Sequence, residues 1–494
     1  MSGKPHSSIT THMNFINGEW RSSLVGEIYV RRNPFDQSEI AAYQDSDVAD
    51  VDLGVAAARG AFDQGPWPRM PAFERGAILR KAASTIRERV DAFVTVMARE
   101  VGQPKAEQRK TVLAAADHLD YYAGLIANRR DEAVYGQRED GLGLVVREPI
   151  GVVGSLTAWN APLSIVHKAC PGMAAGCTLV VKPAHQSAGA SVLLAEVFQS
   201  AGLPAGVFNL ITSARSNGAV VGQAIAGHEQ IDMITFTGSS TTGKAVMRAA
   251  ANNLKRLKLE LGGKSPNVIF EDAPSLDVAA RTAATGIFRL AGQSCQAASR
   301  LLVQESVHDV FVEKLLAEVA RLRLGDPLDD ETTIGPLVSE DQLQRIQSYV
   351  EIGASCGTLL TGGKRPDNQY LSRGWFFEPT VFDRVDPASR LACEEIFGPV
   401  LSILTFRDVD EAIALANSTI FGLVAGCWTS SLQTALRFSR NVRAGGIWVN
   451  SYRDDVVLKY LPVGGFKQSG IGREMGPEGL DAFLETKSIM IKLA

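Results

Sequence analysis

Glu260-Leu-Gly-Gly-Lys-Ser-Pro266 opens the stretch around which this chain is organised, and Gly292-Gln-Ser-Cys295 closes it. The carboxylate and the thiol are 35 positions apart, which leaves room for a strand and a helix between them. Gly262 and Gly263 have no Cβ, so the backbone there can turn sharply or pass close to a bound group. The stretch therefore predicts a chemical unit where two structural halves of the chain meet.

A cysteine that shares a site with a carboxylate indicates a thiol nucleophile with a general base. The thiolate is the reactive form, so Cys295 needs a polar and reachable environment. A lone cysteine is more often a small core residue. The glycine-rich segments around Glu260 and Cys295 favour the reactive interpretation.

The composition indicates a large globular protein. A chain of 494 residues is too long for one simple core, and we expect two large lobes. Hydrophobic residues make up 45% of the chain, which argues against disorder. Lys and Arg number 50 against 54 Asp and Glu, and this near balance gives no support for a nucleic-acid partner.

The sequence also indicates the compartment and the absence of a metal. No apolar run is long enough to span a membrane, so no membrane association is expected. The polar N-terminal segment 1–13 lacks an apolar signal core, which predicts a cytoplasmic protein. Six cysteines without a Cys-x-x-Cys pair predict reduced thiols, and seven scattered histidines predict no metal site.

The hydrophobic periodicity predicts an α/β fold. Short strands are expected within 14–43, and amphipathic helices at 72–101 and 105–128 are separated by Gly102-Gln-Pro104. Residues 151–262 alternate strand and helix, which indicates a parallel sheet covered on both faces. The expected strands are 151–157, 178–182, 207–211, 233–237 and 257–260, and the expected helices are 187–201, 216–226 and 241–253.

A second α/β pattern follows, and two further strand-like segments stand outside both patterns. The second pattern predicts strands at 266–270 and 300–303 and helices at 276–290 and 307–323. Residues 129–150 read as two strands around Gly141 and Gly143, and the tail 486–493 alternates as a further strand. Exposed strands of this kind are templates for pairing with another chain.

A candidate phosphate turn lies at Phe236-Thr-Gly-Ser-Ser-Thr-Thr-Gly243, between a predicted strand and a predicted helix. The chain has no Gly-x-Gly-x-x-Gly motif. Ser239 and the helix N-terminus can donate hydrogen bonds to a pyrophosphate next to Gly238. Such a turn is more often only a helix cap, but its place before Glu260 favours a cofactor role.

The motifs Glu-Leu-Gly-Gly-Lys and Gly-Gln-x-Cys resemble those of the aldehyde dehydrogenase superfamily, and similar motifs continue along nearly the whole chain. The resemblance implies a Rossmann-like cofactor domain from 1–128 and 151–262, and a second α/β catalytic domain from 263–474. It also implies a small β oligomerisation arm built from 129–150 and 475–494. A homodimer or homotetramer is therefore expected.

The resemblance implies a four-step oxidation of a small-molecule aldehyde. The thiolate of Cys295 attacks the aldehyde, and Asn160 in Ala158-Trp-Asn-Ala-Pro162 stabilises the oxyanion together with the Cys295 N–H. Hydride transfer leaves a thioester, and Glu260 activates the water that hydrolyses it. A structural asparagine in a turn is the common alternative for Asn160.

Several cofactor contacts follow from the same resemblance. Trp159 flanks the cofactor, Lys182 binds the adenosine ribose, Glu395 binds the nicotinamide ribose and Phe397 packs on the nicotinamide. His185 stands where the family usually has a glutamate. An imidazole carries no fixed negative charge and ordinarily titrates at about pH 6.5, so both NAD and NADP are expected as cofactors.

The candidate substrate residues are less sharply defined. Ala161 replaces the usual aromatic residue and should widen the aldehyde tunnel, and Tyr452 and Arg453 shape its mouth. Arg289 stands where some relatives that oxidise acidic aldehydes have an arginine, which motivates an acidic-aldehyde hypothesis. The alternative for Arg289 is a salt bridge away from the tunnel.

Three other classes of protein share parts of this pattern. A CoA-acylating dehydrogenase has the same fold and cysteine but transfers the acyl group to a thiol. A non-enzymatic structural relative needs none of the three chemical residues, and a dinucleotide-binding regulatory protein needs no thiol. The presence of Asn160, Glu260 and Cys295 together favours the hydrolytic enzyme.

Overall fold

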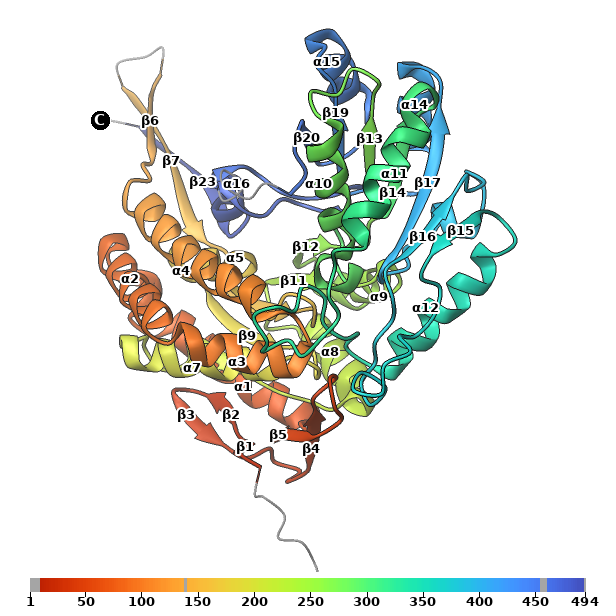
Figure 1. The fold of residues 1–494 in the computed structure, drawn as a ribbon. Coiled ribbons are helices and arrows are strands. Elements are labelled where there is room, and N and C mark those ends of the chain that lie inside the picture. Colours follow the sequence, from red (N-terminus) through yellow and green to blue (C-terminus); the bar gives the residue numbers. More distant parts are fainter. Residues whose placement is uncertain (1–8, 137–139, 454–459, 493–494) are drawn as a thin grey trace, which may run out of the picture.

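The computed structural model describes residues 9–136, 140–453 and 460–492. Two large, mostly parallel sheets dominate the fold, and a small three-stranded sheet projects from the body (Figure 1). Two minor sheets complete the strands: β1 (Thr11–His12), β4 (Ile28–Arg32) and β5 (Glu39–Gln44) form one, and β18 (Phe421–Gly422) and β21 (Phe466–Lys467) the other. The predicted α/β class is confirmed.

The first large sheet has eight strands in the order β22-β12-β11-β8-β9-β10-β2-β3. Its five central strands are parallel: β8 (Val152–Leu156), β9 (Thr178–Lys182), β10 (Phe208–Leu210), β11 (Met233–Thr237) and β12 (Arg256–Glu260). Antiparallel strands complete the two edges: β2 (Asn14–Ile16), β3 (Glu19–Arg21) and β22 (Gly470–Ile471). All five central strands were predicted, within two residues of their observed ends.

Alternating side chains of these strands enter two different cores, as expected for a sheet covered on both faces. Val152 and Val180 pack against α1 (Val48–Asp63) and α8 (Arg215–Gly227), while Val153 and Val181 face the opposite layer. That layer contains α2 (Ala72–Glu88), α3 (Val90–Val101), α4 (Lys105–Ala127), α6 (Cys170–Ala175) and α7 (Ala188–Ala201). α9 (Ser240–Ala250) continues into a short 3₁₀ turn, η2 (Ala251–Asn253).

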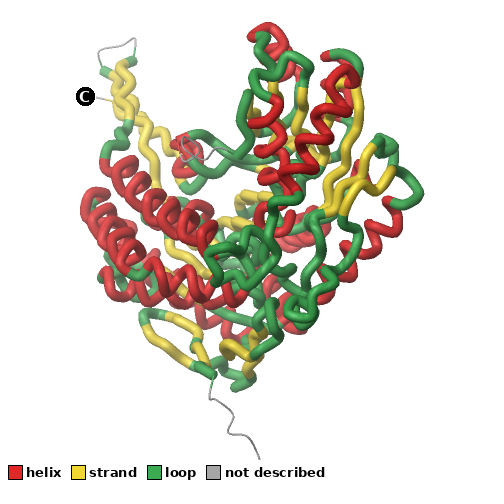
Figure 2. The backbone as a smooth tube through the Cα atoms, viewed as in Figure 1, coloured by secondary structure: helices red, strands yellow, loops and turns green. Residues whose placement is uncertain are grey.

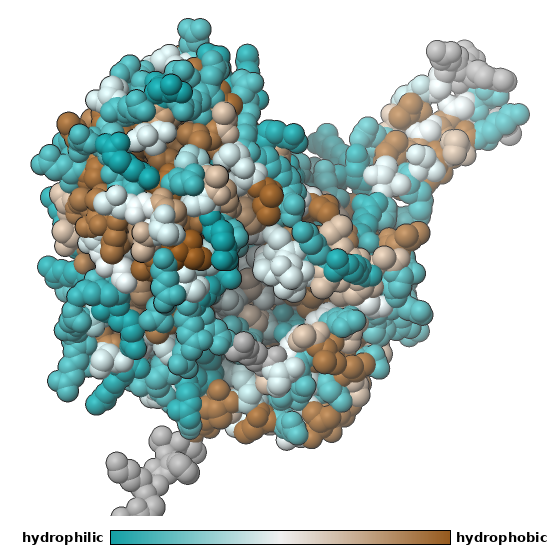
Figure 3. All heavy atoms as spheres, turned by 90° about the vertical axis from the view of Figure 1, so that its right-hand side faces the viewer, coloured by the Kyte–Doolittle hydropathy of each residue, from teal (hydrophilic) through white to brown (hydrophobic). Residues whose placement is uncertain are grey.

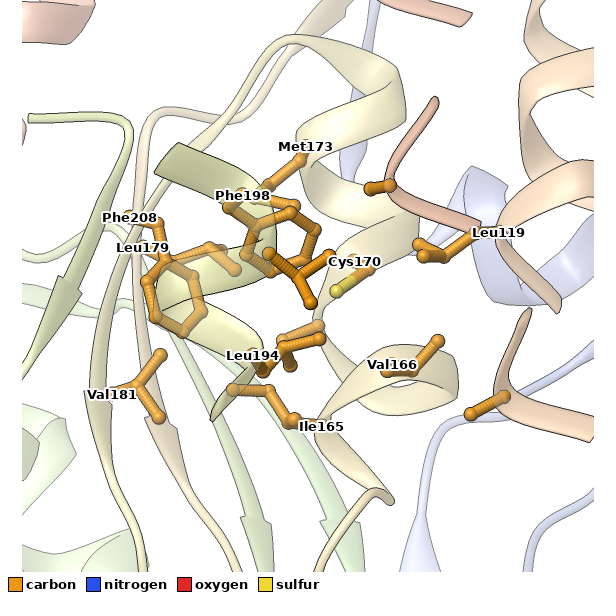
Figure 4. Close-up of a cluster of buried hydrophobic side chains, with 14 of the residues drawn as sticks. Leu119, Ile165, Val166, Cys170, Met173, Leu179, Val181, Leu194, Phe198 and Phe208 are labelled. Carbon is orange, nitrogen blue, oxygen red and sulfur yellow. The ribbon is translucent and has the colours of Figure 1, made fainter. Parts of the chain in front are cut away.

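The core between the first sheet and the layer that contains α7 is continuous and apolar (Figure 4). Phe198 of α7 and Phe208 of β10 pack with their ring centroids 5.1 Å apart. Cys170 points its sulfur into this cluster, and burial raises the pKa of its thiol. Cys170 is therefore a packing residue of this core.

The predicted helix over 72–101 is two helices in the structure. Arg89 separates α2 from α3 with φ −102° and ψ 18°, outside helical geometry. Its guanidinium forms an ion pair with Glu196 of α7 at 2.6 Å. Periodicity alone did not reveal this break, because the apolar face continues across it.

The second large sheet has seven strands in the order β15-β16-β17-β14-β13-β19-β20. They are β13 (Pro266–Ile269), β14 (Arg300–Gln304), β15 (Thr358–Thr361), β16 (Thr380–Asp383), β17 (Val400–Phe406), β19 (Val424–Trp428) and β20 (Gly446–Val449), and all except β15 run parallel to their neighbours. The helices associated with this half are α10 (Leu276–Phe288), α11 (His308–Val319), α12 (Glu340–Gly353), α14 (Val409–Asn417) and α15 (Leu432–Asn441).

The helices predicted at 276–290 and 307–323 both end earlier than expected. α10 ends at Phe288 because Leu290 and Ala291 take left-handed backbone angles, with φ 58° and 54°. α11 begins at His308 after a 3₁₀ turn, η4 (Glu305–Val307), and ends at Val319. The remaining short helical segments are η1 (Trp67–Arg69), α5 (Ile165–Lys168), η3 (Arg289–Gly292), α13 (Arg390–Cys393) and α16 (Gly476–Asp481).

The projecting sheet, called the arm below, consists of β6 (Glu132–Tyr135), β7 (Gly141–Pro149) and β23 (Leu484–Lys492) in the order β23-β7-β6 (Figure 2). The tail strand pairs on one side with the chain's own β7, from Leu484 opposite Pro149 to Lys492 opposite Gly141. Alternation in a sequence indicates a strand but does not identify its neighbour.

The strand order of the first sheet indicates where the candidate site lies. The chain runs from β8 outward to β10 and then returns to add β11 on the other side of β8. Ligands of open parallel sheets bind outside the carboxyl ends of the strands, at such a reversal. Asn160 after β8, Lys182 at the end of β9, Gly238 after β11 and Glu260 at the end of β12 all lie at this edge.

Candidate active site

Cys295 follows a tight turn, residues 290–292, whose backbone takes left-handed angles. Leu290, Ala291 and Gly292 have positive φ values of 58°, 54° and 70°. A Cβ on Gly292 would lie 2.0 Å from the carbonyl oxygen of Gly398, so glycine is required at position 292. The turn before Cys295 is therefore in direct backbone contact with the segment that carries Glu395 and Phe397.

The structure explains why two glycines, Gly262 and Gly263, follow Glu260 so closely in the sequence. A Cβ on Gly263 would lie 2.3 Å from the carbonyl oxygen of Cys295, and a Cβ on Gly262 would lie 2.6 Å from Oε2 of Glu395. The Gly263 N–H donates to Oε1 of Glu395 at 2.9 Å. The missing side chains thus let one backbone segment contact the thiol residue and the carboxylate at the same time.

Asn160 is oriented toward the Cys295 turn. Its side-chain Nδ2 donates to the carbonyl oxygen of Gln293 at 3.2 Å, which uses one of its two N–H groups. Within the described residues the backbone N–H of Cys295 donates no hydrogen bond. Asn160 and Cys295 therefore present two N–H donors for an oxyanion at the sulfur.

Glu260 is buried, and its Oε1 accepts no hydrogen bond from the described residues. Burial raises the pKa of Glu260 well above its usual range, and the nearby Glu474 carboxylate acts in the same direction. Lys168, Lys258 and Arg473 oppose the rise. A carboxylate poised in this way can take up a proton near neutral pH.

The charged groups around Glu260 were not identified from the sequence. Lys168 and Glu474 are both buried and form an ion pair, with Nζ and Oε2 2.7 Å apart. Lys258 donates to the Lys168 carbonyl oxygen at 2.7 Å and lies over the Phe483 ring. Burial lowers the pKa of Lys258 to about 8. No motif marks these residues, because they come from distant segments.

Burial raises the pKa of the Cys295 thiol to about 11. Lys168 and Arg453 oppose this shift, while the carboxylates of Glu260 and Glu395 add to it. The sulfur is therefore a thiol rather than a thiolate at neutral pH in the cofactor-free protein.

Cys295 and Asn160 line a cavity of about 960 Å³. Glu395, Phe397 and Trp159 also line it, and so do Lys182, His185, Gly218, Gln223 and Arg248. Its volume is within the range of sites for small molecules and cofactors. The cavity unites the seven residues predicted to bind the cofactor: Trp159, Lys182, His185, Gly238, Ser239, Glu395 and Phe397.

The polar lining of the cavity fits a nicotinamide dinucleotide. Ser239 caps α9, with its Oγ accepting from the Thr242 N–H at 3.1 Å, so the helix N-terminus faces the cavity. Such a terminus favours phosphate groups. The buried hydroxyl of Thr237, which also lines the cavity, has no hydrogen-bond partner among the described residues and can serve a ligand.

Lys182 and Glu395, which also line the cavity, suit the two riboses of a nicotinamide dinucleotide. Burial lowers the pKa of Lys182 to about 8, with Asp45 opposing, and its Nζ forms a long hydrogen bond of 3.4 Å to the Pro183 carbonyl. Burial raises the pKa of Glu395, while the Gly263 N–H opposes this. Hydroxyl groups of two riboses are suitable partners for these side chains.

Two residues of α12 hold the segment that carries Glu395 and Phe397, and they were not identified from the sequence. Gln342 donates to the Phe397 carbonyl at 2.7 Å, and Arg345 donates to the Ile396 carbonyl at 3.1 Å. Phe397 has φ 62°, and its ring lies edge-on to Trp159 with centroids 5.4 Å apart. The segment is thus held in an unusual conformation by contacts to its backbone.

The candidate substrate residues fall in different places. Tyr452 is buried in a cluster with Cys295 and donates to the Gln296 carbonyl at 3.0 Å. Arg453 is close enough to lower the pKa of Cys295. Ala161 is half-buried in the turn after β8, and none of these three is among the described residues that line the cofactor cavity.

Arg289 forms an ion pair with Glu107 of α4, with Nε and Oε2 2.6 Å apart. This arrangement is the salt bridge that the sequence left open as the alternative to an acidic-aldehyde site. The carboxylate that Arg289 binds in the structure belongs to the protein itself.

The described residues contain no group of three or more His, Cys, Asp or Glu arranged to hold a metal. Over the same residues, no helix is both long and apolar enough to cross a membrane.

Comparisons with known proteins agree with the geometry. The model of the aldehyde dehydrogenase family matches residues 20–489. The chain is 39% identical to "Betaine aldehyde dehydrogenase" of Bacillus subtilis (strain 168), over 96% of each chain. It is 41% identical to "Aldehyde dehydrogenase family 2 member C4" of Arabidopsis thaliana, over 97% of this chain and 94% of the relative.

Solved structures show the same likeness. An NAD-dependent aldehyde dehydrogenase from Sinorhizobium meliloti superposes with a TM-score of 0.95 at 41% identity, covering 98% of this chain and 95% of that one. A betaine aldehyde dehydrogenase from Staphylococcus aureus, solved in complex with NAD+, gives a TM-score of 0.94 at 36% identity, covering 97% of this chain and 94% of that one. The family expected from the motifs is confirmed, and the chain belongs to the aldehyde dehydrogenase family.

Proposed function

We propose that this aldehyde dehydrogenase oxidises its substrate to a carboxylic acid with Cys295 as nucleophile, Asn160 as oxyanion donor and Glu260 as general base. The observation that carries the proposal is that Cys295 and Asn160 line the same cavity that fits a nicotinamide dinucleotide. The Glu260 carboxylate lies close enough to act on the pKa of the Cys295 thiol.

In the first step the Cys295 thiol gives its proton to solvent and its sulfur bonds to the aldehyde carbon, while the carbon–oxygen π bond opens and negative charge develops on the aldehyde oxygen. The N–H of Asn160 that Gln293 does not use, together with the Cys295 backbone N–H, donates to this oxygen. One donor of this kind typically contributes about 3 kcal/mol to transition-state stabilisation. A bound nicotinamide dinucleotide supplies the hydride acceptor, and the acyl group remains on Cys295 as a thioester.

Glu260 acts in the second half of the reaction. Its buried carboxylate takes a proton from water, and the resulting hydroxide attacks the thioester carbon. The carbon–sulfur bond breaks, which releases the carboxylic acid and leaves a thiolate, and the proton held by Glu260 then returns the Cys295 sulfur to a thiol. The raised pKa of Glu260 matches a base that works near neutral pH.

Glu260→Gln should separate the two halves of the reaction. The amide cannot accept a proton, so we expect one equivalent of reduced cofactor in a rapid burst, followed by turnover at least about 100-fold slower than wild type. Rapid mixing with an aldehyde, with and without added CoA, measures this. Acceleration by CoA in the wild type would identify an acylating enzyme instead.

Cys295→Ala is the matched control, because it should show no burst while still binding the cofactor. Steady-state turnover of Glu260→Gln equal to wild type would exclude the assigned base.

The reactivity of Cys295 should depend steeply on pH in the cofactor-free enzyme. Since its thiol pKa is raised to about 11, the thiolate fraction and hence the alkylation rate should keep rising tenfold per unit between pH 7 and 10. Iodoacetamide labelling of the Cys295 peptide, followed by mass spectrometry, measures the rate. A plateau below pH 9 would contradict a raised pKa, and the half-exposed Cys393 serves as internal comparison.

We propose that the enzyme uses both NAD and NADP. His185 lines the cavity beside Lys182, and an imidazole places no fixed negative charge against a 2′-phosphate. The ammonium group of Lys182 can pair with such a phosphate.

His185→Glu should introduce discrimination against NADP. We expect KM for NADP to rise at least about tenfold with little change for NAD, because a carboxylate repels the phosphate and accepts from ribose hydroxyls. Initial rates with both cofactors measure this. His185→Gln is the neutral control, and a wild type that already rejects NADP as strongly as His185→Glu would disprove the account.

We propose that the arm joins two copies of the chain in a homodimer or homotetramer. Within the described residues β6 and β23 are its open edges, and Val134, Tyr135 and Met490 on them are exposed. Figure 3 shows the arm standing out from the body with apolar residues on its surface. Unpaired strand edges with exposed apolar side chains favour pairing with another copy.

We propose a reducing, cytoplasmic compartment, which the six free cysteines support.

Light scattering should give the mass of two or four chains at micromolar concentration. Tyr135→Asp combined with Met490→Asp should shift the mass toward the monomer, because charge on both edges disfavours pairing. A wild-type mass of one chain would reject the arm as an interface.

A further inference from the structure

The turn Gly102-Gln-Pro104, which separates α3 from α4, contacts the catalytic segment. Gln103 is 3% exposed, and its Nε2 donates to the backbone carbonyl oxygen of Asn160 at 2.7 Å. The two residues are far apart in sequence, so the contact exists only in the folded protein. A buried amide that reaches a catalytic residue calls for an explanation beyond ending a helix.

The amide of Gln103 has a fixed direction. Gln108 of α4 is fully buried and donates from its Nε2 to Oε1 of Gln103. With its oxygen used as an acceptor, Gln103 must point its N–H₂ group at Asn160. Gln108 thus determines which end of the Gln103 amide faces the site.

The turn that carries Gln103 is itself held against the other half of the chain. Gly102 has φ 72°, and a Cβ on Gly335 would lie 1.7 Å from the Gly102 carbonyl oxygen. The Lys105 N–H donates to the Pro327 carbonyl at 2.8 Å. These backbone contacts leave Gln103 little freedom to shift.

A second glutamine holds Asn160 from the opposite side. The Gln293 carbonyl accepts from the Asn160 side chain at 3.2 Å. The side chain of Gln293 accepts from the Val338 N–H at 2.9 Å and donates to the Leu290 carbonyl at 3.1 Å. Asn160 is therefore fixed at its backbone by Gln103 and at its side chain by the Cys295 turn.

We propose that Gln103 is a positioning residue for Asn160, holding its backbone so that one side-chain N–H meets the oxyanion formed at Cys295. The proposal rests on the proposed function of Asn160. Oxyanion donors act only within a narrow range of positions, and a shift of about 1 Å can lower a rate about 100-fold.

The test is a double-mutant cycle on hydride transfer, measured in single turnover as formation of reduced cofactor. Gln103→Met has similar length and no donor, and we expect it to lower the rate about tenfold with KM for the cofactor changed less than twofold. In an Asn160→Ala background the same change should lower the rate no further, because the residue through which Gln103 acts is gone.

Gln44→Met is the matched structural control. Gln44 is also 3% exposed, and its side chain likewise accepts one hydrogen bond, from the Ser23 N–H, and donates another, to the His12 carbonyl in the N-terminal region. Its variant should leave the single-turnover rate unchanged. If Gln103→Met fails to fold, Gln103→Glu enters the same cycle, since it keeps the acceptor for Gln108 but has no donor for Asn160.

Equal losses from Gln103→Met in both backgrounds, or no loss in either, would overturn the positioning role. An unchanged rate for Asn160→Ala alone would instead overturn the proposed function of Asn160. The two failures are therefore distinguishable in one set of measurements.

Discussion

The close approach of the Gly263 backbone to the Cys295 carbonyl is the constraint on which the site depends. A single methyl group at position 263 would lie 2.3 Å from that oxygen, so the two segments can meet only through glycine. The same segment bonds Glu395 through the Gly263 N–H and follows directly on Glu260. The two glycines of one motif thus bring Cys295, Glu260 and Glu395 together at the carboxyl edge of the first sheet.

Burial of the reacting groups has an electrostatic consequence. Removing a thiol and a carboxyl from water disfavours their charged forms, and the Glu474 carboxylate adds to this effect on the pKa of Glu260. The ammonium group of Lys168, which is paired with Glu474, opposes the rise in the pKa values of both Cys295 and Glu260. The net shift of both pKa values is upward, so burial outweighs the neighbouring ammonium group.

Much of this could be predicted from the sequence because the signals are local. The apolar runs that form β9 and β11 lie between clear turn residues, and their ends were predicted to the residue. The glycines beside Glu260 and Cys295 mark close backbone approaches, which the structure explains. The cavity likewise gathers the predicted cofactor residues from four separate segments.

The remaining features depend on long-range contacts that leave no local pattern. Lys168, Glu474 and Gln103 come from three distant segments, and nothing in their neighbours indicates that they are buried together with catalytic residues. The partner of Arg289 is Glu107, from a helix that a sequence pattern cannot orient. The pairing of the tail with β7 is of the same kind, because alternation indicates a strand without its register.

Several residues of the site adopt strained backbone conformations, and the surrounding hydrogen bonds explain why these persist. Leu290, Ala291 and Phe397 have positive φ values, each of which costs about 1–2 kcal/mol for a residue with a Cβ. Gln342 and Gln293 donate to the carbonyls of two of these residues, and Arg345 binds the neighbouring Ile396. Each such bond contributes about 1 kcal/mol. Strain and support of similar size leave a turn with one favourable arrangement, and a donor such as Asn160 needs that rigidity to meet a charge that exists only in the transition state.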